Sequence, residues 1–125
     1  PNVREILDYF RQKKRAVVSN KRHHLVVSVL KGLGIALCFD AIIGGDSMAQ
    51  KKPDPLPLNQ VLNSFGISPA KALMVGDGGT DMEAGKKAGV LTCGVTYGLG
   101  KTEELRAAKP DFLIDDLSQL SGYFC

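Results

Sequence analysis

The sequence predicts an α/β fold built on a doubly wound parallel β-sheet with helices on both faces. Short continuous apolar runs, typical of strands that are buried on both faces, alternate with segments whose apolar residues recur at helical spacing. The polar residues of interest directly follow predicted strands, at the edge where such sheets carry their chemistry. A chain of 125 residues suits one domain.

The strands are predicted from apolar runs that are too short for helices. These runs cover residues 16–18, 39–43, 72–75, 91–95 and 112–114. Turn residues close the first two runs, with Ser19-Asn20 after the first and Gly44-Gly45 after the second. The run at 72–75 is the clearest strand of the chain.

The helices are predicted from apolar spacing and from signals at their ends. They are expected over about residues 3–10, 25–30, 57–65, 80–89 and 101–107. Asn2 with Glu5, and Thr80 with Glu83, have the spacing of capping boxes at helix starts. Gly66 is placed to end the third helix.

The composition excludes several classes of protein. With 44% hydrophobic and 23% charged residues, the chain resembles an ordinary globular protein. Its longest apolar run is far short of the roughly 20 residues that span a bilayer, so no membrane association is expected. The net charge of +3 is modest and the basic residues are dispersed, which argues against nucleic acid as a partner.

The cysteines predict free thiols. Three cysteines, an odd number, lie far apart in sequence without a CxxC pair: Cys38, Cys93 and Cys125. We expect buried packing roles and a reducing compartment, hence a cytoplasmic location. The sequence makes no prediction of oligomeric state.

The strongest chemical signal is a pair of acids on a glycine-rich turn. Asp77 follows the strand at 72–75, and Asp81 opens the next predicted helix. Two carboxylates four residues apart on such a turn can converge on one hard cation such as Mg²⁺, which requires oxygen ligands. The simpler alternative is a turn residue and a favourable charge at a helix start.

Two further loops add a hydroxyl and a cation. Ser19, Asn20 and Lys21 follow the strand at 16–18, where a hydroxyl and backbone N–H groups ahead of a helix can bind phosphate oxygens. Lys52 precedes a proline, and a lysine on such a stiffened loop can neutralise phosphate charge. Alone, each is more simply a turn or an exposed loop residue. Together, all three clusters follow strands and supply what holds a phosphoryl group and its Mg²⁺.

On these motifs the sequence resembles the haloacid dehalogenase superfamily of phosphohydrolases, in its phosphoglycolate phosphatase-like branch. The segment at 16–21 is similar to the family's second motif, Lys52-Pro53-Asp54-Pro55 to its third, and the segment at 75–82 to its fourth. The joining stretches match as well, so the resemblance covers essentially the whole chain.

The resemblance implies a Rossmann-like core and Mg²⁺-dependent hydrolysis of a small phosphomonoester, such as phosphoglycolate or a sugar phosphate. It implies that Ser19 and Lys52 act on the phosphate, that the Asn20 amide also binds it, and that Asp77 and Asp81 hold the metal.

One motif of the family is missing. An Asp-x-Asp, whose first aspartate attacks phosphorus, should follow a first strand, and no such motif occurs at the start of this chain. Residues 1–125 are therefore expected to be the C-terminal part of the catalytic core, without its first strand and helical cap, and inactive alone. In the family that strand is central, between those ending at Ser19 and Asp77, so its absence would leave unpaired backbone groups on both neighbours.

Two alternatives remain open at the level of sequence. The first is a non-catalytic phosphate-binding or interaction module derived from the same fold. The second is a receiver-like signalling domain, which shares a doubly wound sheet and an acidic Mg²⁺ site but requires a phospho-accepting aspartate after its third strand. Fold analogy alone does not separate these classes, so the site residues decide between them.

Overall fold

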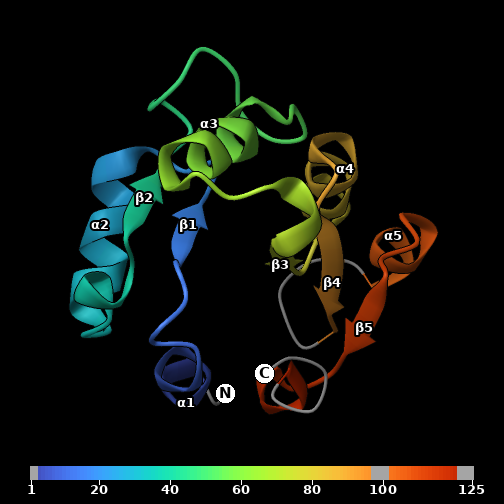
Figure 1. Cartoon of the computed structure of the whole chain (residues 1–125). Coiled ribbons are helices and arrows are strands. Elements are labelled where there is room, and N and C mark those ends of the chain that lie inside the picture. Colours follow the sequence, from blue (N-terminus) through green and yellow to red (C-terminus); the bar gives the residue numbers. More distant parts are fainter. Residues whose placement is uncertain (1–2, 97–101, 121–125) are drawn as a thin grey trace.

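The computed structural model describes residues 3–96 and 102–120. Helices and strands alternate along them as predicted (Figure 1). The helices are α1 (Val3–Tyr9), α2 (His23–Gly32), α3 (Leu56–Phe65), α4 (Gly79–Ala88) and α5 (Thr102–Ala107). The strands are β1 (Ala16–Val18), β2 (Ala41–Ile43), β3 (Leu73–Gly76), β4 (Leu91–Val95) and β5 (Phe112–Ile114). Short 3-10 turns lie at Ala36–Cys38, Pro69–Lys71 and Leu117–Gln119.

The strands form two parallel sheets. β1 pairs with β2, with Val17 opposite Ile42, and β3, β4 and β5 form a three-stranded sheet in that order. Val75 lies opposite Cys93 in this second sheet. Within the described residues β1 and β3 each have a single partner strand, so one edge of each is unpaired. The predicted parallel α/β architecture is confirmed. Its strands form two separate sheets, and the break lies between β1 and β3.

One apolar cluster spans the division on the face covered by α3 and α4. Leu58 and Leu62 of α3 pack with Ala84 of α4, and partly buried Val18 of β1 and Met74 of β3 join the same cluster. Figure 1 shows α3 lying between the two sheets. Burial of these side chains holds the sheets together although their strands do not pair.

Helix α1 performs a similar role on the opposite face. Its Ile6, and Phe10 just after it, pack against the same buried cluster as Leu73 and Val75 of β3, whereas Leu7 packs in the cluster around α2 and β1. Since successive strand residues point to opposite faces, β3 presents Leu73 and Val75 here and Met74 to the other side. Both faces of the sheets are therefore covered.

The helix ends confirm some predictions and correct one. Gly66 and Gly89 follow α3 and α4 with φ of 66° and 80°, in the left-handed region that glycine favours at helix C-termini. The capping box predicted from Thr80 and Glu83 is wrong, because Gly78 is the N-cap of α4 and no side chain caps it. Glu83 instead pairs with Lys87 at 3.3 Å. The cap predicted at Asn2 lies outside the described residues.

Two of the three cysteines lie within the described residues, and Cys125 lies outside them. Cys93 on β4 is fully buried and Cys38 half-buried, and both are free thiols. Burial raises the pKa of the Cys93 thiol to about 11. Among the described residues no helix combines the length and apolarity that crossing a bilayer requires.

Candidate functional site

The loop after β1 is a tight turn that exposes polar groups. Ser19 is half-buried, and its Oγ accepts a hydrogen bond from the Lys21 backbone N–H at 3.1 Å. The carbonyl of Lys21 accepts from the Gly45 N–H at 2.6 Å, which joins this loop to the one after β2. A short hydroxyl-to-backbone bond of this kind fixes the turn locally.

The two glycines after β2 allow the loops to touch. A Cβ on Gly44 would overlap the backbone of His23, and a Cβ on Gly45 would overlap the carbonyl oxygen of Asn20. Only glycine lets the two backbones approach so closely. The Gly44-Gly45 pair therefore determines where the β1 loop lies, in addition to closing β2.

Asp46 completes the contact between these loops. Its Oδ1 accepts a hydrogen bond at 2.7 Å from the backbone N–H of His23, at the start of α2. That bond lowers the pKa of the Asp46 carboxyl. Since α2 has no side-chain cap from its own N-cap residue, Asp46 satisfies a helix N–H from a distant loop.

Lys52 is tied to the β1 loop through its backbone. The side-chain amide of Asn20 donates to the carbonyl of Lys52 at 2.9 Å and accepts from the N–H of Lys52 at 3.0 Å. These two reciprocal bonds link segments that lie 32 residues apart in sequence. They place the loop after β2 against the loop after β1.

The Lys52 ammonium reaches the loop after β3. Its Nζ forms a buried ion pair with Asp81 Oδ1, and the two side chains are only 9% and 12% exposed. The Asp81 carboxyl packs on the Cα of Gly76 at the end of β3, where a Cβ would overlap it. Burial at this level removes water from both charges, so each depends on the other for compensation.

The contacts join the three predicted loops into one cluster. Asn20, Lys52 and Asp81 are linked directly by hydrogen bonds or an ion pair. Ser19 precedes Asn20, and Asp77 follows Gly76, against which Asp81 packs, so both lie next in sequence to residues of the cluster. Asp77 is half-buried.

The cluster contains only two acids, Asp77 and Asp81, although their oxygens are suitable ligands for a hard cation. Within residues 3–96 and 102–120 no three His, Cys, Asp or Glu side chains gather as a metal site. Asp77 and Asp81 supply carboxylate oxygens, the ligands that Mg²⁺ prefers. Lys52 already occupies Oδ1 of Asp81.

Sequence reasoning missed the roles of several residues here. Asn20 was expected to contribute its backbone amide, whereas its side chain holds Lys52. Gly44 and Gly45 were expected only to close a strand and Asp46 was given no role, although all three position the β1 loop. Two adjacent glycines followed by an acid were the available signal, since such pairs often mark close backbone approach.

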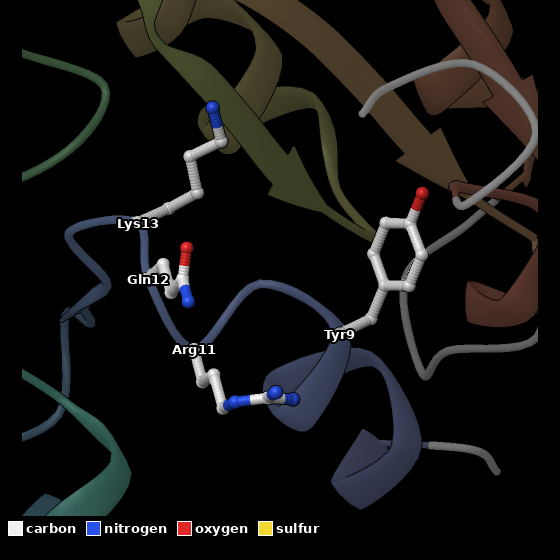
Figure 2. A pocket seen from close by; sticks show the side chains of 4 residues that line it. All are labelled: Tyr9, Arg11, Gln12 and Lys13. Carbon is white, nitrogen blue, oxygen red and sulfur yellow. The ribbon is translucent and has the colours of Figure 1, made fainter.

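Two surface hollows formed by described residues differ in their distance from the cluster along the sequence. One of about 440 Å³ is lined by Tyr9, Arg11, Gln12 and Lys13, none of them a site residue (Figure 2). Figure 2 shows these side chains extending from the end of α1 and the turn after it. A second hollow, of about 550 Å³, runs along α4 and the end of α5 and includes Pro53, Gly79 and Thr80, which adjoin site residues in sequence.

Comparisons with known proteins identify the relatives of this arrangement. Residues 1–95 match the family described as haloacid dehalogenase-like hydrolase. A phosphoglycolate phosphatase of Vibrio vulnificus (strain YJ016) is 42% identical over 122 residues, which cover 96% of this chain and 54% of the relative. One of Neisseria meningitidis (serogroup A, strain Z2491) is 44% identical over 108 residues, or 84% of this chain and 46% of the relative.

A solved structure agrees with these relatives. The crystal structure of a predicted phosphoglycolate phosphatase from Haemophilus somnus 129pt superimposes with a TM-score of 0.93 at 34% identity, over 98% of this chain and 56% of that one. The chain thus spans about half the length of the relatives that it matches. With the family matched over most of its length, the chain belongs to the haloacid dehalogenase-like hydrolases.

Proposed function

We propose that the complete protein carrying this chain is a Mg²⁺-dependent phosphatase that hydrolyses a small phosphomonoester. Phosphoglycolate is the first substrate to test, because the relatives at about 40% identity are named for it. The observation that carries the proposal is the buried Lys52–Asp81 ion pair. The Asn20 side chain links this pair to the loop after β1, where we expect phosphate to bind.

Each residue of the cluster has a proposed task. The Ser19 hydroxyl and the Asn20 backbone N–H would donate to phosphate oxygens, and the Lys52 ammonium would neutralise the charge that develops on them. Asp77 would hold Mg²⁺, with Asp81 as direct or water-mediated support. The bound cation would stabilise negative charge on the transferring group. Asp81 would also keep the Lys52 ammonium oriented toward the site.

The nucleophile would come from outside this chain. In the proposal, a strand upstream of residue 1 lies between β1 and β3 and places an aspartate beside the cluster. Its carboxylate attacks phosphorus, the alcohol leaves with a proton from a neighbouring acid, and water then hydrolyses the aspartyl-phosphate. The edges of β1 and β3 that no described strand pairs support this placement. We therefore expect no turnover by residues 1–125 alone, and a reducing, cytoplasmic setting that suits the free thiols.

The test compares Lys52 with its neighbour Lys51 in the complete protein. Lys52→Ala should lower kcat/KM for phosphoglycolate by about 100-fold or more, because it removes a charge aimed at the phosphate. Lys51→Ala should leave the rate nearly unchanged, since that side chain is exposed. Phosphate release measured with and without added Mg²⁺ provides the readout.

A folding control is needed because Lys52→Ala leaves Asp81 buried without its cation. The double variant Lys52→Met/Asp81→Asn removes both charges and should fold while remaining inactive. Equal activity of the Lys52 variant and the wild type would contradict the proposal. Binding of inorganic phosphate by a wild-type protein without turnover of any phosphomonoester would favour the non-catalytic binding module instead.

A further inference from the structure

The Asn20 side chain makes an unusual pair of contacts for a loop residue. Its amide oxygen and nitrogen bond the N–H and the C=O of the same residue, Lys52, at 3.0 and 2.9 Å. An amide that satisfies both backbone groups of one residue fixes the position of that residue's Cα as a strand neighbour would. Asn20 itself is exposed, so its side chain contributes little to the apolar core.

This contact matters because of what the Lys52 side chain has to do. A lysine ammonium sits on a flexible four-carbon stem and does not orient itself. Here the Lys52 side chain is only 9% exposed, and its ammonium meets Asp81 on a different loop. A small displacement of the Lys52 backbone would therefore also displace the ammonium at the end of the side chain. The loop from Lys51 to Pro55 contains no helix or strand that could hold it.

We propose that Asn20 is a positioning residue that sets the place of the Lys52 ammonium by clamping the Lys52 backbone. This inference rests on the proposed function of Lys52 and adds a second task for Asn20, separate from any phosphate contact of its backbone N–H. The site then depends on a side chain whose amide faces the lysine loop rather than the substrate.

The variants separate the two bonds of the clamp. Asn20→Ala removes both, and Asn20→Asp keeps an acceptor for the Lys52 N–H but has no donor for the Lys52 carbonyl. In the complete protein, kcat/KM should fall by about 10- to 100-fold in Asn20→Ala, the cost of a small misplacement of a catalytic group. Asn20→Asp should lie between Asn20→Ala and the wild type.

A matched control is available near the starts of β4 and β5, whereas the site loops follow the ends of β1, β2 and β3. The Asp111 carboxylate also accepts two hydrogen bonds from one residue, the backbone N–H and Oγ1 of Thr92 at 2.9 and 3.1 Å. Asp111→Ala therefore removes a similar clamp away from the site. It should lower thermal stability yet keep kcat/KM within about twofold of the wild type, because distant sites act independently.

Two readouts distinguish positioning from a general loss of structure. In a double-mutant cycle, Asn20→Ala should add nothing to the loss of kcat/KM and of inorganic phosphate affinity already caused by Lys52→Ala. Acetic anhydride labelling, followed by peptide mass spectrometry, should modify wild-type Lys52 much more slowly than exposed Lys51. In Asn20→Ala, labelling of Lys52 should accelerate by about tenfold, as expected for the loss of two hydrogen bonds.

The outcomes separate failure of this inference from failure of the proposed function. Additive losses in the cycle, or unchanged Lys52 labelling in Asn20→Ala, would overturn the clamp. A wild-type protein without phosphatase activity would overturn the proposed function. The labelling experiment needs no turnover, so it decides on the clamp in either case.

Discussion

Lys52 and Asp81 bring opposite charges into a place from which water is largely excluded. With 9% and 12% of their side chains exposed, the pair has little solvent to compensate for the loss of either partner. Removing one partner of a buried pair costs about 3–5 kcal/mol, whereas the intact pair adds little net stability over apolar residues. A protein that retains such a pair therefore gains something other than stability, and here we propose that it is an oriented ammonium.

Asp111 makes the stability of the folded chain depend on pH in the acid range. Two hydrogen bonds from Thr92, the backbone bond being the larger influence, lower the pKa of the Asp111 carboxyl below its ordinary value. Its charged form is thus favoured in the folded state. The resulting stabilisation is fully present above about pH 4, and it is lost as the pH falls through the lower pKa of the folded protein.

The Asp111→Asn variant tests this dependence. The Asn oxygen can still accept hydrogen bonds from Thr92 but cannot titrate. Between pH 7 and pH 3, the urea midpoint of the wild type should fall further than that of the variant. Equal losses in both proteins would show that Asp111 contributes nothing to acid sensitivity. Because other carboxylates titrate in both proteins, only the difference between the two curves is informative.

At the scale of elements, glycines decide how the loops meet. A Cβ at Gly45 would overlap the carbonyl oxygen of Asn20, whereas a Cβ at Gly32, within α2, would meet nothing within 4 Å. Gly45→Ala should therefore destabilise the protein by about 1–3 kcal/mol, through forced displacement of the β1 loop. Gly32→Ala should be neutral or stabilise it by up to about 1 kcal/mol, because alanine favours helix.

Urea unfolding of the two glycine variants checks both expectations. Gly45→Ala should in addition lose phosphatase activity in the complete protein, because the displaced loop carries Ser19 and Asn20. If Gly45→Ala were as stable as Gly32→Ala, the close approach of the two loops would not be required for folding.

The elements themselves were largely predictable from local sequence. The run at 91–95 became β4 with the same bounds, and Gly66 ended α3 as expected. The predicted strand at 39–43 was too long, because Ala36–Cys38 forms a 3-10 turn and pairing begins only at Ala41. The Thr80 cap failed for a similar reason, since glycine in an extended conformation occupies the N-cap position of α4. Local pattern locates elements, whereas tertiary contacts set their ends.

The site was predictable at the level of loops and less so at the level of atoms. Placing polar residues after parallel strands was enough to bring Asn20, Lys52 and Asp81 together. The clamp by the Asn20 side chain and the bond from His23 to Asp46 depend on loop conformations that no periodicity encodes. The ion pair between Lys52 and Asp81 also depends on these loop conformations. The sequence pattern had grouped Asp81 only with Asp77.

At the scale of the whole molecule, the break between the two sheets determines where the backbone N–H groups of β1 and β3 point. The Ser19 N–H donates to Ile43 of β2 at 2.9 Å, so the alternation of a strand points the Val18 N–H to the opposite side. On β3, the Ala72 carbonyl accepts from Leu91 of β4, so the Val75 N–H points away from β4 by the same rule. Both N–H groups lie on strand edges that have no partner strand among residues 3–96 and 102–120.

Hydrogen exchange can therefore show whether a strand fits between the sheets. In residues 1–125 alone, Val18 and Val75 should exchange faster than their neighbours Val17 and Met74, which face a paired strand. In a chimera with the upstream half of a relative, protection of Val18 and Val75 should rise by about 100-fold or more, to the level of those neighbours. Val17 and Met74 serve as internal controls in the same protein, because global stabilisation would slow all four amides together. Strong protection of Val18 and Val75 in the shorter chain would mean that the two edges find another partner, and that no upstream strand is required there.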